Sequence, residues 1–371
     1  MRILFIHLDD INNCPPALNA IQVQVDLGNQ VTLLAYDTNN LSDNIRKKIE
    51  VIDFGKNNNS EWVIKRYFNR LRKRLKIRNF LKRNLEKYDL IWITSEIFVR
   101  EVGKVLFKTK YIIQLMEMVN YVPLFGHSRL LKFNIKKFAQ KACKIVVPEE
   151  NRAYIIKTKW ELEKLPIILP NKPYQSSLTF ELTENAKKMV SKVKNEKKKI
   201  ILYQGGFSVD RRFEEFAEAI NLIGDEYVLY LMGKKNEYCN KILEQYPNVK
   251  YLGFLNPPEH LIIAQYAHIG ILSYIPIKAD FYSELNALYC APNKIYEYAL
   301  CGLPMLGTNV LGLKYPFEKY NIGICCDELS SKSICECIRK IEDNYKKKKK
   351  SCDIFYNSVD LFEIMKEILE I

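Results

Sequence analysis

The sequence contains no long apolar run. Its longest stretch without a charged residue, 261–277, is broken by polar side chains and by Gly270 and Pro276, whereas a membrane-spanning helix needs about 20 consecutive apolar residues. The N-terminal apolar run, 3–6, is too short for a signal peptide and is soon followed by Asp9. We therefore expect no membrane-spanning segment, and a protein that is cytoplasmic or peripheral on the inner face of a membrane.

Metal-ligand patterns are scarce as well. The chain has ten cysteines and four histidines, but no C-x-x-C pair and no Cys/His set with zinc-finger spacing. This favours reduced, buried thiols. No Asp-x-Asp motif occurs, and the adjacent pair Asp9 and Asp10 is better explained as a helix cap or an acceptor contact. The sequence therefore predicts no metal site and a reaction that needs no metal cofactor.

Positive charge is abundant. The 371 residues include 57 Lys and Arg against 43 Asp and Glu, a net charge of +14. Such an excess indicates anionic partners, which can be nucleic acid, an anionic membrane surface or phosphorylated small molecules. The hydrophobic fraction of 48% is ordinary for globular proteins, and the length suggests two or three domains.

Strand-like and helix-like segments alternate along both halves of the chain. This pattern is typical of βαβ units with parallel sheets. It predicts an α/β protein with two Rossmann-like, doubly wound domains, 1–175 and 198–345, which face each other across a cleft. The polar, lysine-rich stretch 174–199 is expected to be the linker. A C-terminal helical segment, 346–371, begins with five lysines interpreted as a solvated hinge, and it can cross back to the first domain.

The segment from Pro292 to Gly302 is the most informative. Pro292 and Asn293 suit the start of a helix, and Gly302 suits its end. Lys294 and the free N–H groups of the first turn form an anion site. Glu297 lies one turn further, where its carboxylate can accept hydrogen bonds from vicinal ribose hydroxyls. The alternative is a core helix with a solvent-facing glutamate.

A second segment follows the apolar run 200–203, which is expected to be a strand. Gly205 and Gly206 permit close backbone approach to a phosphate, and Arg211 and Arg212 can hold its oxygens. The alternative is an ordinary turn with solvated arginines, because the G-x-G-x-x-G fingerprint is absent.

Together the two segments resemble the C-terminal domain of GT-B glycosyltransferases, and of glycosyltransferase family 4 in particular. The resemblance covers residues 145–326 and depends on strings that occur in order. These are Ile201-Leu202-Tyr203-Gln204-Gly205-Gly206, Leu231-Met232-Gly233, Asn248-Val249-Lys250-Tyr251-Leu252-Gly253-Phe254, and Pro292-Asn293-Lys294 through Glu297 to Gly302-Leu303-Pro304.

The resemblance implies a reaction and a donor site. The reaction would transfer a sugar from a UDP- or GDP-linked donor to a glycan or lipid-linked acceptor, with retention, in cell-surface polysaccharide synthesis. Glu297 would bind the ribose, and Arg211 would neutralise the diphosphate. The donor-binding residues that it implies are Gly205, Gly206, Arg211, Arg212, Asn293, Lys294 and Glu297.

The chain departs from the family's pattern at two places. Members often have a glutamate eight residues before the ribose-binding one, where this chain has Tyr289. They also often have a catalytic histidine after a strand of the N-terminal domain, where this chain has residues 114–117 without one. Glu117 or His127 is the candidate substitute, beside Arg211, in the catalytic set.

A basic stretch, 61–87, is predicted to form an amphipathic helix. Apolar residues recur there at near-helical spacing among ten cations, and no acid occurs from Trp62 to Leu85. This composition favours contact with an anionic membrane surface. A solvated face on a core-packed helix is the alternative. Nucleic acid is not expected, because no recognised motif accompanies the charge.

Three other functions remain open from the sequence. A nucleotide-sugar epimerase of the non-hydrolysing type has the same fold. A catalytically inactive sugar-nucleotide-binding subunit of a polysaccharide assembly would explain Tyr289 and the missing histidine. A basic nucleic-acid-binding protein is the third.

Overall fold

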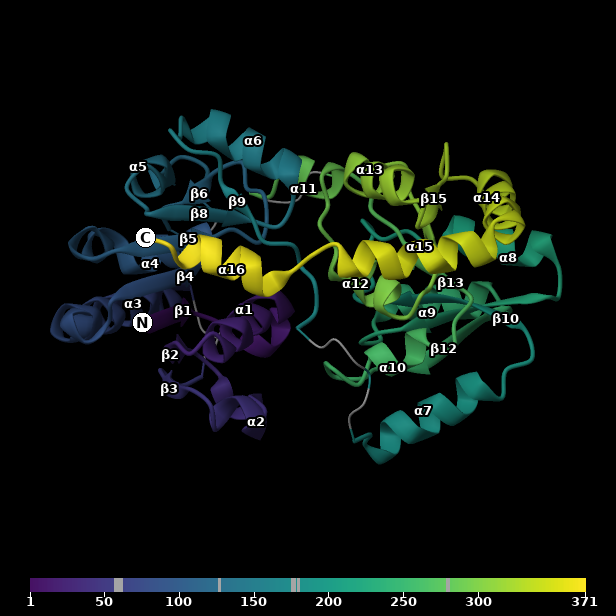
Figure 1. The fold of residues 1–371 in the computed structure, drawn as a ribbon, viewed down its shortest axis with the longest axis horizontal. Coiled ribbons are helices and arrows are strands. Elements are labelled where there is room, and N and C mark those ends of the chain that lie inside the picture. The colour runs from purple at the N-terminus through teal and green to yellow at the C-terminus, as the bar shows by residue number, and fades with distance from the viewer. Residues whose placement is uncertain (57–62, 126–127, 175–177, 179–180, 278–280) are drawn as a thin grey trace. The chain divides into compact units, whose positions relative to one another are not determined.

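A computed structural model describes the chain except for residues 57–62, 126–127, 175–177, 179–180 and 278–280, and it describes no side chains for 63–67. The chain forms two compact units (Figure 1). Unit 1 comprises Met1–Pro170, Lys278–Ser283 and Asp360–Ile371. Unit 2 comprises Asn171–Ile277 and Glu284–Val359.

Unit 1 is built on a seven-stranded parallel sheet with the order β3-β2-β1-β4-β5-β8-β9. Its strands are β1 (Arg2–His7), β2 (Gln30–Ala35), β3 (Glu50–Asp53), β4 (Leu90–Thr94), β5 (Tyr111–Gln114), β8 (Lys144–Val147) and β9 (Ile167–Ile168). A separate antiparallel hairpin consists of β6 (Val122–Pro123) and β7 (Lys132–Phe133). The helices are α1 (Pro15–Asp26), α2 (Asp43–Arg46), α3 (Val63–Asn84), α4 (Glu96–Val102), α5 (Ile135–Ala139), α6 (Glu150–Trp160) and α16 (Leu361–Leu369).

Unit 2 is built on a six-stranded parallel sheet with the order β12-β11-β10-β13-β14-β15. Its strands are β10 (Lys199–Gln204), β11 (Tyr227–Met232), β12 (Val249–Gly253), β13 (Ile269–Leu272), β14 (Met305–Gly307) and β15 (Gly323–Cys325). The helices are α7 (Glu184–Lys194), α8 (Glu214–Ile223), α9 (Glu237–Gln245), α10 (Leu261–Ala264), α11 (Leu285–Leu288), α12 (Asn293–Leu300), α13 (Leu311–Tyr320), α14 (Ser331–Asp343) and α15 (Tyr345–Asn357).

The apolar strands of both sheets are buried on both faces, as parallel sheets covered by helices require. Local signals set the helix ends. Pro15 and Pro16 open α1, and Gly28, with φ +81°, follows its end. Ser330 caps α14 by accepting a hydrogen bond from the Ser333 N–H. In each sheet the strand order reverses beside the first strand, so the fold class expected from the sequence, two Rossmann-like α/β domains, is confirmed.

The C-terminal segment differs from the expectation in the position of its lysines and in the position of its break. The five lysines expected to form a hinge lie inside α15, and one of them, Lys348, is buried and donates hydrogen bonds to Asn321 Oδ1 (2.8 Å) and to the Gly323 carbonyl (3.2 Å). The break follows α15, and Asp360 caps α16 beyond it. The last helix of the chain, α16, belongs to unit 1. The stretch expected to be the linker contains α7, which belongs to unit 2.

The basic stretch forms α3, and its apolar residues are divided between the core and the surface. Ile77 and Leu81 are buried, whereas Phe68, Leu71 and Leu75 are exposed. Two of its cations do not face solvent freely. Arg74 is buried and pairs with Glu101 at 2.6 Å, and Arg78 is half-buried. No helix in the described part of the chain is both long and apolar enough to cross a bilayer.

Candidate active site

The carboxyl edge of the unit 2 sheet gathers the residues that the sequence singled out there. The helix α12 begins at Asn293, with Pro292 as its N-cap, and Gly302 follows its end with φ +60°. Asn171 donates a hydrogen bond to the Ala291 carbonyl (2.7 Å) and so fixes the chain just before the helix.

Glu297 is buried beside two polar partners from other elements. Its Oε2 accepts a hydrogen bond from Gln204 Nε2 (3.0 Å), and its Oε1 lies 3.3 Å from His260 Nε2. Burial alone would raise the pKa of Glu297, but His260, Lys294 and Gln204 outweigh it and lower this pKa. The carboxylate is therefore charged and buried, and the alternative of a solvent-facing glutamate does not hold.

Two further polar atoms next to this carboxylate have no protein partner. Gln204 Oε1 and His260 Nδ1 are buried without a hydrogen bond to any described residue. Buried polar atoms are nearly always paired, so each such exception indicates a missing ligand, water or partner. The surroundings of Glu297 thus have both an unused acceptor and an unused ring nitrogen.

Lys294 lies directly against the loop that follows β10. A Cβ atom on Gly205 would stand 2.7 Å from Lys294 Cε and 2.9 Å from its Nζ, so a larger residue there would displace the lysine. Gly205 also has φ +146°, which favours glycine. Burial lowers the pKa of Lys294, Glu297 opposes this shift, and the nearby Arg211 adds to it. Gly206 has open space at its Cβ position.

Arg211 links the loops that follow β10 and β13, the two strands at the reversal of strand order. Its guanidinium stacks on the Tyr274 ring, with Cζ 3.9 Å from the centroid, and Nη1 bonds Asp210 Oδ2 at 2.5 Å. The Ile275 N–H donates to the Asp210 carbonyl (3.0 Å), which ties the loops together. Burial alone would lower the pKa of Arg211, but Tyr274 and Asp210 raise it overall.

Arg212 lies apart from this cluster. Its side chain is half exposed, and its Nη2 bonds Glu215 Oε1. The structure thus brings Glu297, Lys294, Gly205 and Arg211 together.

Two residues beside Glu297 were not identified from the sequence. His260 was not considered, and Gln204, the last residue of β10, was given no role. Only the end of that predicted strand could have pointed to Gln204, and His260 carries no sequence signal.

In unit 1, the catalytic candidate Glu117 is exposed and follows β5. The other candidate, His127, lies outside the described residues. A residue not considered from the sequence, Glu96, directly follows β4 as the first residue of α4. It is buried, its Oε1 has no partner among the described residues, and burial raises its pKa to about 7, although Lys159 and Arg152 oppose the shift.

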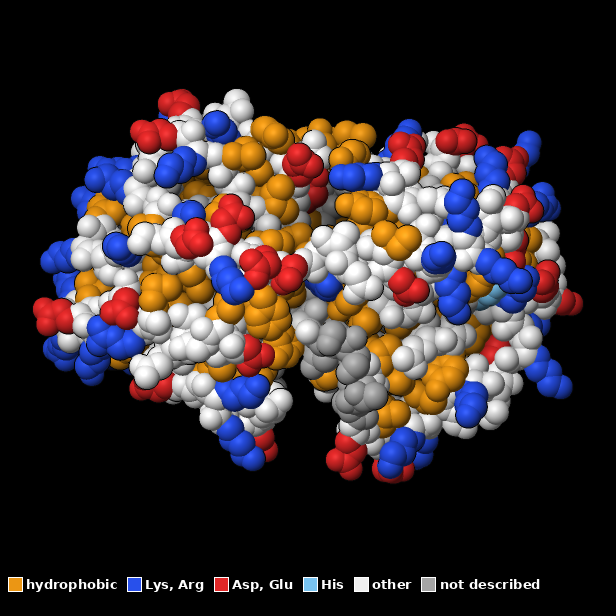
Figure 2. Space-filling model, viewed as in Figure 1, with side chains coloured by type: hydrophobic (Ala, Val, Ile, Leu, Met, Phe, Trp, Pro, Cys, Tyr) orange, Lys and Arg blue, Asp and Glu red, His pale blue; other side chains and the backbone are white. Residues whose placement is uncertain are grey.

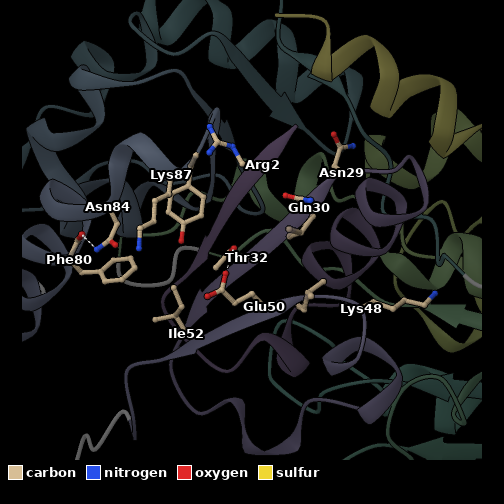
Figure 3. Close-up of a pocket in the computed structure, with 13 residues that line it drawn as sticks. Arg2, Asn29, Gln30, Thr32, Lys48, Glu50, Ile52, Phe80, Asn84 and Lys87 are labelled. Carbon is tan, nitrogen blue, oxygen red and sulfur yellow. Dashed lines mark hydrogen bonds between the residues drawn. The ribbon is translucent and has the colours of Figure 1, made fainter.

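The amino edge of the unit 1 sheet has a cavity of about 580 Å³ (Figure 3). Arg2, Gln30 and Glu50, the first residues of β1, β2 and β3, line it. Figure 3 shows Thr32 and Glu50 pointing toward one another, and Thr32 Oγ1 donates to Glu50 Oε2 at 2.9 Å. In doubly wound sheets ligands bind at the carboxyl ends of the strands, so we do not assign the reaction to this cavity.

Residues 184–354 match the family described as "Glycosyl transferases group 1". No curated protein matches the chain in sequence.

Solved structures resemble the whole chain. A glycosyltransferase from Rickettsia africae has a TM-score of 0.71 at 15% identity, with 100% of this chain and 97% of that chain covered. HepE of Anabaena, crystallised with UDP and glucose, has 0.70 at 13% identity, with 100% and 98% covered. A putative UDP-N-acetylglucosamine 2-epimerase from Listeria monocytogenes has 0.62 at 9%, with 100% and 94% covered. At these identities the likeness concerns the fold alone.

Proposed function

We propose that the chain is a glycosyltransferase, which transfers a sugar from a nucleoside diphosphate donor to a glycan or lipid-linked acceptor. The match of residues 184–354 to the glycosyltransferase group 1 family and the fold shared with a solved glycosyltransferase support this proposal. The main observation behind this proposal is the buried, charged Glu297, one turn from Lys294 and the start of α12. The polar atoms Gln204 Oε1 and His260 Nδ1 beside it have no partner among the described residues. A cell-surface polysaccharide is the product class that the sequence pattern favours.

The donor would occupy this cluster by complementary charge. The carboxylate of Glu297 accepts hydrogen bonds from the ribose hydroxyls, and Gln204 Oε1 offers a further acceptor. Arg211, Lys294 and the first N–H groups of α12 neutralise the diphosphate. The crystals of HepE with UDP and glucose support a UDP-linked donor for this fold.

In the proposed reaction the bond between the anomeric carbon and the diphosphate oxygen breaks, and its electron pair goes to the diphosphate. Arg211 and Lys294 stabilise that developing charge without a metal ion, which is electrostatic catalysis by preorganised cations. The acceptor hydroxyl forms the new bond on the same face and releases its proton, so the configuration is retained. Glu117 of unit 1 is the candidate to receive that proton.

The test is calorimetry with UDP, GDP and their nucleosides, followed by a panel of nucleotide sugars assayed for slow hydrolysis by nuclear magnetic resonance. Binding of the diphosphate together with sugar release supports the proposal. Interconversion of the donor without hydrolysis would instead identify an epimerase, the activity named for the similar Listeria fold. Binding without either reaction would identify an inactive subunit.

Association with an anionic membrane is a separate part of the proposal. The exposed Phe68, Leu71 and Leu75 alternate along α3 with exposed Arg70 and Arg72. Figure 2 shows Lys and Arg side chains gathered along the end of unit 1 where Figure 1 places α3 and α5. Apolar side chains among cations are typical of helices that lie in a membrane interface.

A liposome sedimentation assay tests this part. The triple variant Arg70→Ser, Arg72→Ser, Lys76→Ser should release the protein from acidic vesicles, because each such cation contributes about 1 kcal/mol near the surface. Arg74 is left intact because it pairs with Glu101 inside unit 1. The control removes three exposed lysines of α15, Lys346, Lys347 and Lys350. Equal release by the two variants would reject a role for α3.

A further inference from the structure

Unit 1 has another cavity, of about 490 Å³, bordered by α3, the 3-10 helix Gly103–Lys108 that follows α4, the hairpin β6–β7 and α5. Its apolar lining comes from Val105, Leu124, Phe133 and Phe138. Its volume lies within the range of about 300–1,000 Å³ that is usual for small-molecule sites.

The polar lining of this cavity is almost entirely cationic. Arg78, Lys82, Lys104, Lys132 and Lys137 line it, and none of its lining residues, all of which are described, is acidic. The four lysines are exposed and form no ion pair with a described carboxylate. The cavity therefore combines an apolar surface with uncompensated positive charge.

Arg78 is the fixed member of this group. Its Nε donates to the Glu101 carbonyl (3.0 Å) and its Nη2 to the Arg100 carbonyl (3.2 Å). The guanidinium lies against Gly103, where an added Cβ would stand 2.8 Å from Nη2. Two of its five N–H donors are thus used within the described protein, and the remaining three are available to an anion in the cavity.

The cavity at the amino edge of the sheet provides the contrast. Two of its three cations, Arg2 and Lys48, pair with Asp89 (2.7 Å) and Asp26 (3.7 Å), and Glu50 lines it together with the third, Lys87. Most of the positive charge there is compensated within the described protein. The cavity beside Arg78 has five cations and no acid in its lining, so of the two cavities it is the better site for an external anion.

We propose that this cavity binds the headgroup end of one anionic amphiphile, an acidic phospholipid. The phosphate lies among Arg78 and the four lysines, and the first carbons of the acyl chain lie on Val105, Leu124 and Phe138. This inference deepens the membrane association proposed above and rests on it. It goes beyond that proposal because it requires a discrete, saturable site away from the exposed Phe68, Leu71 and Leu75 of α3.

The experiment is calorimetry with short-chain phosphatidylglycerol kept below its micelle concentration. The pocket variant is Lys104→Glu with Lys137→Glu. The matched control is Lys108→Glu with Lys141→Glu, which changes the net charge equally at exposed lysines that do not line the cavity. We expect saturable binding to the wild type and the control, and a dissociation constant raised about tenfold or more in the pocket variant.

Three results would overturn the proposal. These are no binding to the wild type, equal weakening in both variants, and equally tight binding of either phosphatidylcholine or glycerol phosphate. Equal weakening would indicate general surface electrostatics, and tight glycerol phosphate binding would indicate a plain anion site. Titration of the same variants with UDP keeps the outcomes separate, because lysines in unit 1 should leave donor binding in unit 2 unchanged.

Discussion

The two units share one strand order and differ in what their carboxyl edges carry. In both sheets the first strand lies at the reversal, with the second and third strands on one side and the later strands on the other. The edge of unit 2 holds the cations Arg211 and Lys294 beside the buried Glu297, with Asp210 paired to Arg211. The edge of unit 1 holds the carboxylates Glu96 and Glu117, after β4 and β5.

This difference shows that the scaffold fixes where a site lies, while its charge decides what it binds. A cationic edge suits a diphosphate, and an edge with carboxylates suits hydroxyl groups and proton transfer. The comparison gives separate expectations for the two units, and exchanging charged groups on either edge tests it.

The largest effect is expected for Arg211→Ala. Loss of this guanidinium removes a cation from the developing charge of the leaving group, so sugar release from the donor should slow about a hundredfold to a thousandfold. Affinity for the nucleoside should not change, because no phosphate is present. Arg212→Ala is the control, since that side chain is half exposed and paired with Glu215. Equal losses in both variants would remove Arg211 from the site.

At the edge of unit 1, Glu96 should make the free energy of unfolding depend on pH. The pKa of Glu96 is raised from 4.5 to about 7, so between these values the folded chain retains a proton that the unfolded chain has released. The associated stability is complete below about pH 4.5 and is lost as the pH rises through about 7. Glu96→Gln should therefore stabilise the protein by roughly 2–3 kcal/mol at about pH 8 and by little at about pH 5.

Urea unfolding of variant and wild type measures this difference. The wild-type curve alone is insufficient because burial lowers the pKa of His7 to about 4, which makes stability rise with pH over part of the same range. Glu117→Gln, at an exposed position, should give no such difference. A pH-independent effect of Glu96→Gln would show that this carboxyl is ionised in the folded state.

Glu297→Gln should weaken UDP or GDP binding about tenfold to a hundredfold, because one acceptor of the ribose hydroxyls becomes a donor. The variant should fold, since the new amide can still accept from Gln204 and donate toward His260. Glu96→Gln should leave this affinity unchanged and serves as the control from unit 1. Unchanged affinity in Glu297→Gln would show that the buried carboxylate does not bind the donor.

The sequence predicted the helix of the donor site because its signals are local. Pro292 and Gly302 delimit α12, and the spacing between them places Glu297 one turn inside it. The partners of Glu297 were not predictable, because His260 and Gln204 come from segments that only tertiary folding brings together.

Two surface features show where local sequence signals stop, and one interpretation, that of the lysine run, was wrong. A run of lysines suggests a solvent-exposed segment, yet Lys348 is buried and donates hydrogen bonds to carbonyl and amide oxygens beside β15. Near-helical spacing identified α3, whose apolar side chains the fold divides between the core, at Ile77, and the surface, at Leu75. Periodicity identified both helices, but which face is covered depends on the neighbours that the fold provides.

The smallest effect is expected from removing metal ions. EDTA should leave sugar release unchanged, because Arg211, Lys294 and the N-terminus of α12 supply the positive charge that a divalent ion would otherwise give the diphosphate. In unit 1, the adjacent Asp9 and Asp10 are engaged locally: Asp10 Oδ1 accepts from the Asn12 N–H (3.0 Å), and Asp9 Oδ1 accepts from the Asp10 N–H (3.0 Å). The measurement is donor hydrolysis with and without EDTA. Loss of activity that Mn²⁺ or Mg²⁺ restores would mean that the cationic edge of unit 2 is insufficient by itself.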